Sequence, residues 1–276
     1  MSAHRMDLDW PMAEGAPAGD EYVKYADVYD VLFGDIKDDA EFYVRCASQQ
    51  LPPGGRILEL GTGTGRVAEH FLRAGYNVTG VDASAEMLVH AARNLEAYAR
   101  QFDWARADIR ELHLGQQYKL AVAPYGMMAH LLTDDDRRAA FRRVYEHLEP
   151  GGMLVFDDMP GWLAGHADAA RLDVRRTGFD PVAKMPVRMM SNCIEVAGKP
   201  LSVRYDFIDW LQGDEVARRL VIRVVFRDME LDDELTLLKE AGFAEVDLLG
   251  DWDGRPFDRK NLQANSRLIL RCRRAA

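Results

Sequence analysis

The sequence has few cysteines and no long apolar segment, and these absences exclude several classes of protein. Its three cysteines, Cys46, Cys193 and Cys272, are widely spaced and odd in number, which indicates neither a disulfide framework nor a metal cluster. No stretch is apolar over the length of a membrane span, and residues 1–20 lack the apolar core of a signal peptide. We therefore expect a cytoplasmic protein with no bound metal and no membrane partner.

An excess of basic residues is also missing. Lys and Arg total 35 against 45 Asp and Glu, which gives a formal net charge of −10. Because nucleic-acid phosphates bind basic surfaces, this charge argues against nucleic acid as a partner. With 276 residues, 48% hydrophobic and 29% charged, the chain can bury the core of one elaborated α/β domain or of a domain with a cap.

The most informative segment is residues 56–66, an apolar strand that runs into a glycine-rich turn and then a helix predicted over residues 67–74. Gly61, Gly63 and Gly65 alternate in this turn. Glycine adopts backbone angles that other residues rarely take and lets a ligand lie against the main chain. Because the helix directs free N–H groups towards that ligand, the turn is predicted to be a binding loop.

Two details restrict the ligand. A dinucleotide-binding fingerprint has its third glycine three residues after the second, where this chain has Arg66, and the Gly-Lys-Ser/Thr of a phosphate-binding P-loop is absent. Glu59 precedes the turn, and a carboxylate there repels phosphate and suits a cationic ligand. These features disfavour a pyrophosphate ligand and an NAD-dependent oxidoreductase.

The motif Glu59-x-Gly61-x-Gly63-x-Gly65 resembles the first motif of the class I S-adenosylmethionine-dependent methyltransferases, and three further segments follow in the family's order. The resemblance covers about residues 22–160, with a weaker echo from residue 231 onwards. It implies S-adenosyl-L-methionine as cofactor and a doubly wound, mostly parallel seven-stranded α/β sheet. It also implies that the cofactor contacts Thr62, Ala83, Met87 and Pro124 as well as the glycine loop.

Two acids at strand ends extend the resemblance. Asp82 ends a strand predicted over residues 76–82, where it could accept hydrogen bonds from both hydroxyls of a ribose, while Ser84 could cap the helix predicted over residues 85–100. In the family, an acid after the third strand, here residues 102–107, accepts from the adenine amino group. Asp108 and the backbone of Ile109 match that position; the alternative is a turn-forming aspartate.

Three tyrosines mark a helix near the N-terminus. Tyr22, Tyr25 and Tyr29 recur at helical spacing and share one face. The face either packs against the core or forms a lid, because in related small-molecule methyltransferases a Tyr-Asp pair closes over the methionine end of the cofactor. Tyr29-Asp30 matches that pair, so Tyr29 is predicted to bind cofactor and to take part in catalysis.

The loop after the predicted fourth strand, residues 118–123, should border the same crevice, because the first and fourth strands of such a sheet lie side by side where the winding reverses. The segment Ala-Pro-Tyr-Gly at residues 123–126 lacks the asparagine of the Asn-Pro-Pro-Tyr-like motif of nucleic-acid amine methyltransferases. His130-Leu131 resembles the His-Leu pair of methyltransferases that act on amino sugars and glycine. His130 is predicted to be a general base or a substrate-orienting group, with a core histidine or a cofactor contact as the alternatives, and Tyr125 is predicted to contact substrate.

Further site candidates lie later in the chain. Asp157 and Asp158 follow a strand predicted over residues 153–156, and Asp158 either faces substrate, binds a metal with its neighbour or serves a turn; no third metal ligand is identifiable, so we predict none. Trp252 lies in a loop that resembles the family's last segment and is predicted to line the site. The remaining elements are helices over 39–50, 134–148 and 231–241 and a hairpin of 244–249 with 267–272.

Residues 188–196, 202–211 and 217–227 alternate apolar and polar residues, which is typical of an antiparallel sheet. We predict a β cap over residues 161–228, inserted between the fifth and sixth strands of an α/β domain formed by residues 21–160 and 229–276. A mobile tail, residues 1–20, precedes it. The cap is expected to cover the substrate pocket, to form a homodimer surface, or both.

The expected function is methyl transfer to an amine or hydroxyl of a small metabolite, as in bacterial secondary metabolism. The alternatives are a methyltransferase that acts on protein or RNA and a non-catalytic S-adenosylmethionine-binding subunit. Most arginines of the cap are expected to lie on a solvent-exposed face, although one or two could hold a carboxylate or phosphate of the substrate.

Overall fold

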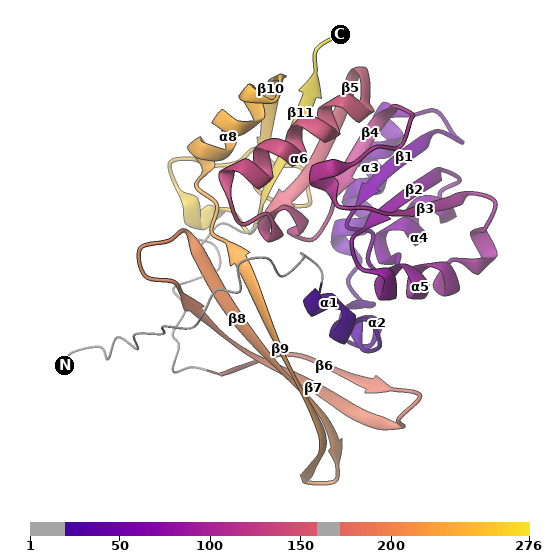
Figure 1. Cartoon of the computed structure of the whole chain (residues 1–276), viewed down its shortest axis with the longest axis vertical. Helices are drawn as coiled ribbons and strands as arrows, with labels where there is room; N and C mark the ends of the chain where they lie inside the picture. Colours follow the sequence, from indigo (N-terminus) through magenta and orange to yellow (C-terminus); the bar gives the residue numbers. More distant parts are fainter. Residues whose placement is uncertain (1–19, 159–171) are drawn as a thin grey trace.

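A computed structural model describes residues 20–158 and 172–276. The predicted mobile tail therefore lies outside the described residues except for Asp20, as does the beginning of the predicted cap. In the described part, helices cover both faces of a seven-stranded sheet, and a separate four-stranded sheet projects from one end of this unit (Figure 1).

The large sheet has the strand order β10-β11-β5-β4-β1-β2-β3. Strands β1 to β5 pair in parallel, whereas β11 is antiparallel to both β5 and β10. This arrangement confirms the predicted fold class. The strands are β1 (Arg56–Leu60), β2 (Asn77–Asp82), β3 (Phe102–Arg106), β4 (Tyr118–Ala123), β5 (Leu148–Asp158), β10 (Phe243–Leu249) and β11 (Leu268–Arg274).

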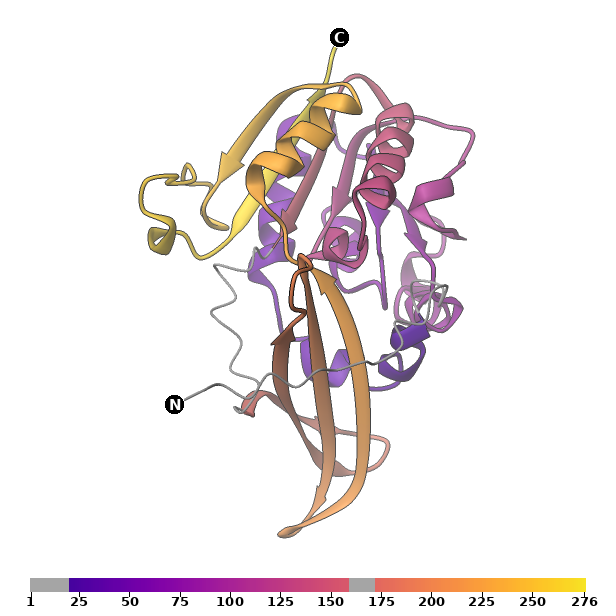
Figure 2. The ribbon, with the colours of Figure 1, turned by 60° about the vertical axis from the view of Figure 1, so that its left-hand side comes forward.

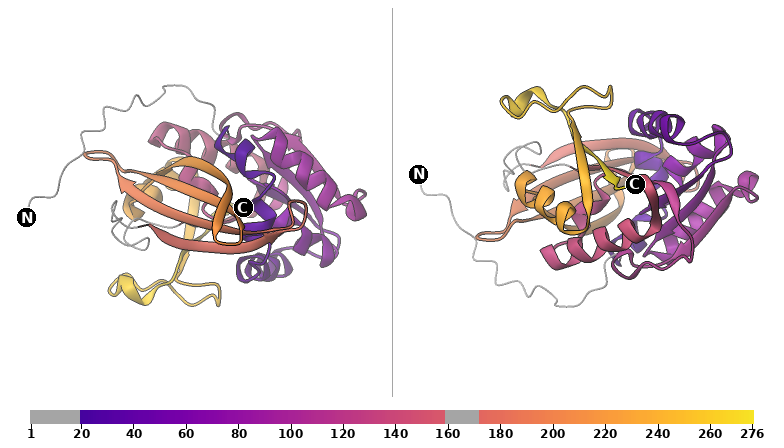
Figure 3. Two further views of the ribbon diagram at one scale, coloured as in Figure 1. Left: turned by 90° about the horizontal axis from the view of Figure 1, so that it is seen from below. Right: turned by 90° about the horizontal axis from the view of Figure 1, so that it is seen from above.

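Each face of the large sheet has its own hydrophobic core. Helices α3 (Asp38–Gln50), α4 (Arg66–Arg73) and α5 (Ala85–Asn94) cover one face, and α6 (Asp134–His147) and α8 (Leu231–Glu240) cover the other (Figure 3). Ile57 and Leu58 are both fully buried, one in each core, because successive side chains of a strand point to opposite faces. Four short 3₁₀ helices complete this unit: η1 (Glu96–Tyr98), η2 (Ile109–Glu111), η3 (Met127–His130) and η4 (Leu262–Ala264).

The second sheet follows β5 and forms the predicted β cap. It consists of β6 (Asp173–Asp180), β7 (Met185–Glu195), β8 (Leu201–Gln212) and β9 (Glu215–Arg227), paired antiparallel in chain order (Figure 2). The sequence predicts three of these strands and misses β6. That edge strand is largely exposed and rich in charged residues, so it lacks the apolar alternation on which the other predictions depend.

The N-terminal tyrosines lie on two short helices, so the prediction of one continuous helix is wrong. Helix α1 (Asp20–Tyr25) ends before Val28, whose φ of −120° and ψ of −4° are not helical, and α2 (Tyr29–Phe33) follows. Tyr25 and Val28 are each 1% exposed and pack against inward-facing residues of the cap. Burying both side chains therefore takes precedence over helix continuity, and the two helices lie between the cap and the α/β unit (Figure 1).

Other differences concern where elements end. The helix predicted over residues 85–100 ends at Asn94 and is followed by η1, and β5 begins at Leu148, the last residue of the helix predicted over residues 134–148 and five residues before the predicted start of the strand. Among the helices of residues 20–158 and 172–276, none combines the length and the apolar composition that crossing a membrane requires.

Candidate functional site

A cavity opens at the carboxyl ends of β1, β2 and β4, under helices α1 and α2. Its walls combine the glycine loop, the ends of the neighbouring strands, the loop after β4 and two tyrosines of the N-terminal helices. The lining residues are Tyr22, Tyr29, Glu59, Gly61, Thr62, Gly63, Arg66, Val67, Asp82, Ala83, Met87, Ala107, Asp108, Ile109, Pro124, Tyr125, Met127, His130 and Leu131. We refer to the part formed by residues 59–63 and Asp82 as the glycine-loop end, and to the part formed by Tyr22, residues 125–127, His130 and Leu131 as the His130 end.

The three glycines of the loop have left-handed backbone angles, with φ of 67°, 57° and 85° at Gly61, Gly63 and Gly65. A Cβ atom on Gly61 would lie 2.4 Å from Cγ of Met127, which also lines the cavity, and one on Gly65 would lie 2.7 Å from Cδ1 of Leu95. Gly65 does not line the cavity but caps α4 and allows close packing on α5. Gly61 thus makes room for the Met127 side chain at the cavity wall, whereas Gly65 sets the position of the helix behind it.

Asp82 lies at the end of β2 and faces the loop. Its Oδ2 accepts a hydrogen bond from the Gly63 amide at 2.8 Å, and its Oδ1 accepts one from the Ser84 amide at 2.9 Å. Ser84, as the sequence indicates, is the N-cap of α5 and accepts from the Met87 amide. Burial raises the pKa of Asp82, and the backbone hydrogen bonds oppose this shift. Each carboxylate oxygen keeps a lone pair for a further donor, such as a ligand hydroxyl.

Asp108 also lines the cavity but already has a strong partner. Burial raises its pKa, and hydrogen bonds from Arg110 outweigh that effect and hold the pKa below its usual value. The Arg110 side chain donates to both carboxylate oxygens and reaches Asp136 on α6 at 2.6 Å. The sequence reasoning does not anticipate Arg110. A ligand amino group at Asp108 would have to share the carboxylate with this guanidinium.

Glu59 is 1% exposed and accepts a hydrogen bond from the Thr62 hydroxyl at 2.6 Å. Burial raises its pKa to about 8, although the Thr62 hydrogen bond and the charge of Arg66 act in the opposite direction. The carboxyl group is therefore largely protonated at neutral pH. A ligand that brings positive charge would favour its ionised form, which agrees with the prediction of a cationic ligand.

The N-terminal helices are attached to the glycine loop. Asp30 accepts from the Thr64 hydroxyl at 2.5 Å and from the Asn94 side chain at 2.7 Å, which connects α2 to the loop and to α5. Tyr29, the predicted lid residue, lines the cavity and packs against Phe33 with ring centroids 4.8 Å apart. Burial raises the pKa of Tyr29, so its hydroxyl stays protonated.

The loop after β4 is held by a buried acid. Tyr125 and Gly126 both have positive φ, and their amides donate to the Asp157 carboxylate at 2.7 and 3.1 Å. The Tyr43 hydroxyl donates to the same carboxylate at 2.6 Å. Burial raises the pKa of Asp157 to about 6 against these hydrogen bonds. Asp157 thus positions the loop that carries the His130 end of the cavity.

His130 faces the cavity at its far end. Its Nε2 shares a hydrogen bond with the Tyr22 hydroxyl, 2.8 Å away, and its ring lies 5.0 Å from the ring of Phe226 on the cap. Burial first, and the positive charge of Arg204 second, lower the pKa of His130 to about 4. The imidazole is therefore neutral over the physiological pH range, in contact with both the N-terminal helix and the cap.

Two predicted substrate residues do not line the cavity. Asp158 is 1% exposed and pairs with Arg137 at 3.2 Å, so the structure places it in a buried network instead of facing substrate. Trp252 packs against the rings of Phe42 and Tyr43, with centroids 5.4 and 6.1 Å away. Both side chains are removed from the cavity by burial and packing that the local sequence does not reveal.

The sequence does not identify several of the lining residues as part of the site, above all Tyr22 and Arg66. Arg66 donates to both carboxylate oxygens of Asp39, at 2.8 and 2.5 Å, and its guanidinium lies 5.2 Å from the Tyr125 ring. The sequence places Arg66 in the glycine loop. It does not predict the pairing with Asp39, because the two residues are distant in sequence. Among the residues that the structure describes, no group of three His, Cys, Asp or Glu is arranged to hold a metal ion.

Comparisons with known proteins identify the family and relatives of this chain. Residues 57–152 match the family model described as "Methyltransferase domain". The chain is 31% identical over 165 residues to a dTDP-3-amino-3,4,6-trideoxy-alpha-D-glucopyranose N,N-dimethyltransferase of Streptomyces venezuelae. The aligned segment covers 55% of this chain and 67% of that protein. The chain is 32% identical over 149 residues to a glycine/sarcosine N-methyltransferase of Halorhodospira halochloris, 50% of this chain and 53% of that protein.

The fold also matches solved structures. One is an S-adenosylmethionine-dependent methyltransferase from Clostridium acetobutylicum, with a TM-score of 0.72. The match covers 92% of this chain and 99% of that one at 19% sequence identity. At this identity the likeness concerns the fold, and it includes the greater part of the chain.

Proposed function

Because the chain belongs to the class I S-adenosylmethionine-dependent methyltransferases, we propose that it transfers the methyl group to an amine, or a hydroxyl, of a small metabolite. S-adenosylmethionine is the cofactor of this family, which excludes the oxidoreductase alternative. The relatives named above act on small amines by their names, and this supports an amine as the preferred acceptor.

The cavity suits this cofactor at its glycine-loop end. Gly61 leaves a surface without a side chain, Asp82 has lone pairs for ribose hydroxyls, and buried Glu59 favours a ligand with positive charge. We assign cofactor contacts to these residues and to Tyr29, Thr62, Gly63, Ala83, Met87, Asp108, Ile109 and Pro124, which also line the cavity. When bound, the cofactor supplies an activated methyl group on a sulfonium, so the protein's main task is alignment and exclusion of water.

The observation that carries the proposal is the Tyr22–His130 pair at the opposite end of the same cavity. A pKa of about 4 makes His130 a weak base. To take a proton from an alkylammonium of pKa about 10 would cost roughly 8 kcal/mol, so deprotonation by His130 is disfavoured. We therefore assign to the pair an orienting role, in which neutral His130 and the Tyr22 hydroxyl hold an acceptor that enters as a free amine. Tyr125 contributes to the same wall.

The position of the cap supports a small acceptor. Phe226 of β9 touches His130, and the N-terminal helices pack between the cap and the α/β unit, so the His130 end is covered from two directions. A net charge of −10 further disfavours a nucleic-acid acceptor. We also propose a homodimer through the cap and a cytoplasmic location. Val216 and Val221, which are 44% and 43% exposed on β9, support the former.

The direct test is transfer of labelled methyl from S-adenosylmethionine into a cell extract, followed by separation of the products by size. The proposal predicts label in the small-molecule fraction, from which the acceptor can be identified. Label confined to macromolecules would contradict the small acceptor and favour a protein or RNA substrate. The same extract without the protein serves as the control for label transferred by other enzymes.

A further inference from the structure

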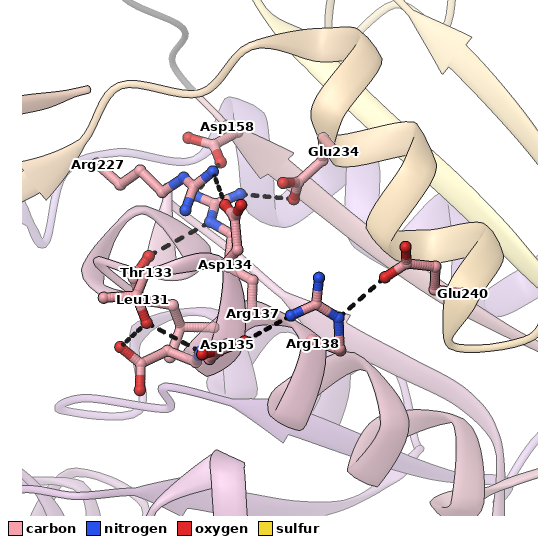
Figure 4. A network of polar contacts seen from close by, with 11 residues as sticks. Leu131, Thr133, Asp134, Asp135, Arg137, Arg138, Asp158, Arg227, Glu234 and Glu240 are labelled. Carbon is pink, nitrogen blue, oxygen red and sulfur yellow. Dashed lines mark hydrogen bonds and ion pairs between the residues drawn. The ribbon is translucent and has the colours of Figure 1, made fainter. Parts of the chain in front are cut away.

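A buried network of ion pairs surrounds the first turn of α6 (Figure 4). The side chain of Arg137 is fully buried. Its Nη2 lies 3.2 Å from Oδ2 of Asp158, and its Nη1 lies 2.6 Å from Oε1 of Glu234 on α8. A buried guanidinium needs such carboxylates to compensate for its lost hydration, and its planar shape fixes their relative positions.

The last residue of β5 and the last residue of β9 both lie at this turn. Asp158 is the last residue of β5, which precedes the cap in sequence, and Arg227 is the last residue of β9, where the chain leaves the cap. Arg227 forms an ion pair with Asp134, the first residue of α6. Its side chain is only 7% exposed, whereas that of Asp134 is 59% exposed. One helical turn therefore forms ion pairs with the last residue of β5 and with the last residue of β9.

The same turn also holds the loop that carries His130. Arg137 Nε donates to the backbone oxygen of Leu131, 3.4 Å away, and Leu131 lines the cavity next to His130. On the cap side, Phe226 precedes Arg227 and contacts the His130 ring. A shift of this turn would thus move both walls of the His130 end, the loop and the cap.

We propose that Arg137 and the Asp134–Arg227 pair are positioning residues that set the cap and the His130 loop at a fixed distance across the acceptor end of the cavity. This proposal rests on the proposed function, because it concerns the place where the acceptor binds. Arg137 acts through Leu131 and Asp158, and Arg227 acts through Phe226. None of the three charged residues lines the cavity.

The chain offers a matched pair of variants for the test. Asp134→Asn removes the partner of Arg227 at a largely exposed position, so the fold should survive the change. Asp135→Asn makes the same substitution one residue later in the same helical turn, where the carboxylate is 96% exposed and pairs with Arg138. Arg138 contacts Glu240 on α8 and neither the cap nor the His130 loop (Figure 4). Both variants alter the charge at the start of α6 equally.

The readout is hydrogen–deuterium exchange of the whole chain, followed by mass spectrometry of peptides that cover residues 126–132 and 222–228. In the loop, the amides of Ala129 and Leu131 donate to Gly126 and Met128, and in the cap the Asp228 amide donates to Pro200. We expect Asp134→Asn to speed exchange in both peptides about fivefold or more, and Asp135→Asn to leave both within about twofold of the wild type. Faster exchange in neither peptide, or only in the cap peptide, would overturn the proposal.

A kinetic measurement separates positioning from a general loss of stability. With the small-molecule fraction of the extract as acceptor, Asp134→Asn should raise the amount needed for half-maximal rate at least threefold, with a smaller change in the maximal rate. Arg137→Lys, which keeps the charge but not the fork, should act in the same direction if it folds. S-adenosylhomocysteine affinity should stay within about twofold in all variants. An equal loss of that affinity would overturn the positioning role.

The outcomes also distinguish this proposal from the proposed function. If the wild type binds S-adenosylhomocysteine but labels only macromolecules, the small acceptor is wrong. The coupled exchange of the two peptides then still decides whether α6 positions the cap and the loop.

Discussion

The glycine-loop end and the His130 end of the cavity differ in how far apart in sequence their residues lie. Glu59, Gly61, Gly63 and Asp82 belong to one βαβ unit, in which the Gly63 amide donates to the Asp82 carboxylate and the glycines have left-handed backbone angles. At the other end, the Tyr22–His130 pair joins residues 108 positions apart, and Phe226 arrives from the cap. Local backbone geometry defines the first end, and tertiary packing of distant side chains defines the second.

This difference assigns separate tasks to the two ends. The glycine-loop end should determine cofactor affinity, because its groups are assigned to the ribose hydroxyls and the positive charge of the cofactor. The His130 end should determine turnover and acceptor choice, because the cap and the N-terminal helices contribute to it. Substitutions at the two ends should therefore separate binding from catalysis.

The largest effect is expected for Gly61→Ala. The new methyl group would lie 2.4 Å from Met127 in a left-handed backbone conformation, at a cost of about 1–3 kcal/mol for overpacking and about 1–2 kcal/mol for strain. Displacement of the loop should lower S-adenosylhomocysteine affinity about 100-fold or more, as calorimetry would show. Gly75→Ala is the control, because Gly75 has a φ of 86° but open space around it. It should leave affinity within about twofold.

A somewhat smaller effect is expected for Asp82→Ala. Loss of charged hydrogen bonds worth roughly 1.5 to 3 kcal/mol should weaken S-adenosylhomocysteine binding tenfold or more. Asp103→Ala is the matched control, since Asp103 lies on the neighbouring strand β3 and pairs with Arg56 outside the cavity. Unchanged calorimetric affinity in the Asp82 variant would refute the ribose assignment.

His130→Gln tests the His130 end of the cavity. Because an orienting hydrogen bond contributes about 1 kcal/mol or more, we expect turnover to fall about tenfold while S-adenosylhomocysteine affinity stays within about twofold. Tyr22→Phe should reduce turnover in the same way, and the double variant should lose less than the product of the two single effects, because both remove one hydrogen bond. Full activity of His130→Gln would return the histidine to a structural role.

The smallest effect concerns pH. A pKa of about 4 keeps His130 neutral from pH 5.5 to 8, so the ratio of the rates of the wild type and His130→Gln should be constant over that range. With an ordinary pKa of about 6.5, the neutral fraction at pH 5.5 would be about one tenth, and the ratio would fall accordingly. Such a fall would contradict the buried, neutral imidazole on which the orienting role depends.

The same shift predicts a stability effect with a definite sign. The pKa of His130 is lower in the folded state than in the unfolded chain, so its contribution is fully present above pH 6.5 and is lost as the pH falls towards 4. Urea unfolding of the wild type should therefore lose roughly 3 kcal/mol more than unfolding of His130→Gln between these limits. Parallel pH dependence of the two proteins would indicate an unperturbed histidine.

The sequence predicts the fold and the glycine-loop end well for a physical reason. Alternating glycines, an acid before them and an acid at the next strand end are local patterns, and parallel strands bring their carboxyl ends to one edge. The resemblance to the methyltransferase family implies the fold class, which the structure confirms, and apolar alternation predicts three strands of the β cap. The cofactor assignments within this end remain predictions for the variants above.

The remainder depends on contacts between distant segments. Tyr25 and Val28 break the predicted N-terminal helix because the cap buries both side chains, and no local signal in that helix identifies the cap. Asp158 was predicted to face substrate because it ends a strand at the correct edge. The structure instead pairs it with Arg137, which also pairs with Glu234 on α8. This arrangement depends on α6, α8 and the end of β5 lying together in the fold. Sequence spacing alone contains no such information.

The most direct test of this division combines two measurements on one preparation of His130→Gln: calorimetric titration with S-adenosylhomocysteine, and transfer of labelled methyl to the small-molecule fraction. We predict wild-type affinity, within about twofold, together with about tenfold slower transfer. Affinity and transfer that fall together would contradict it, because the His130 end would then belong to the cofactor site and the cavity would not be divided between donor and acceptor.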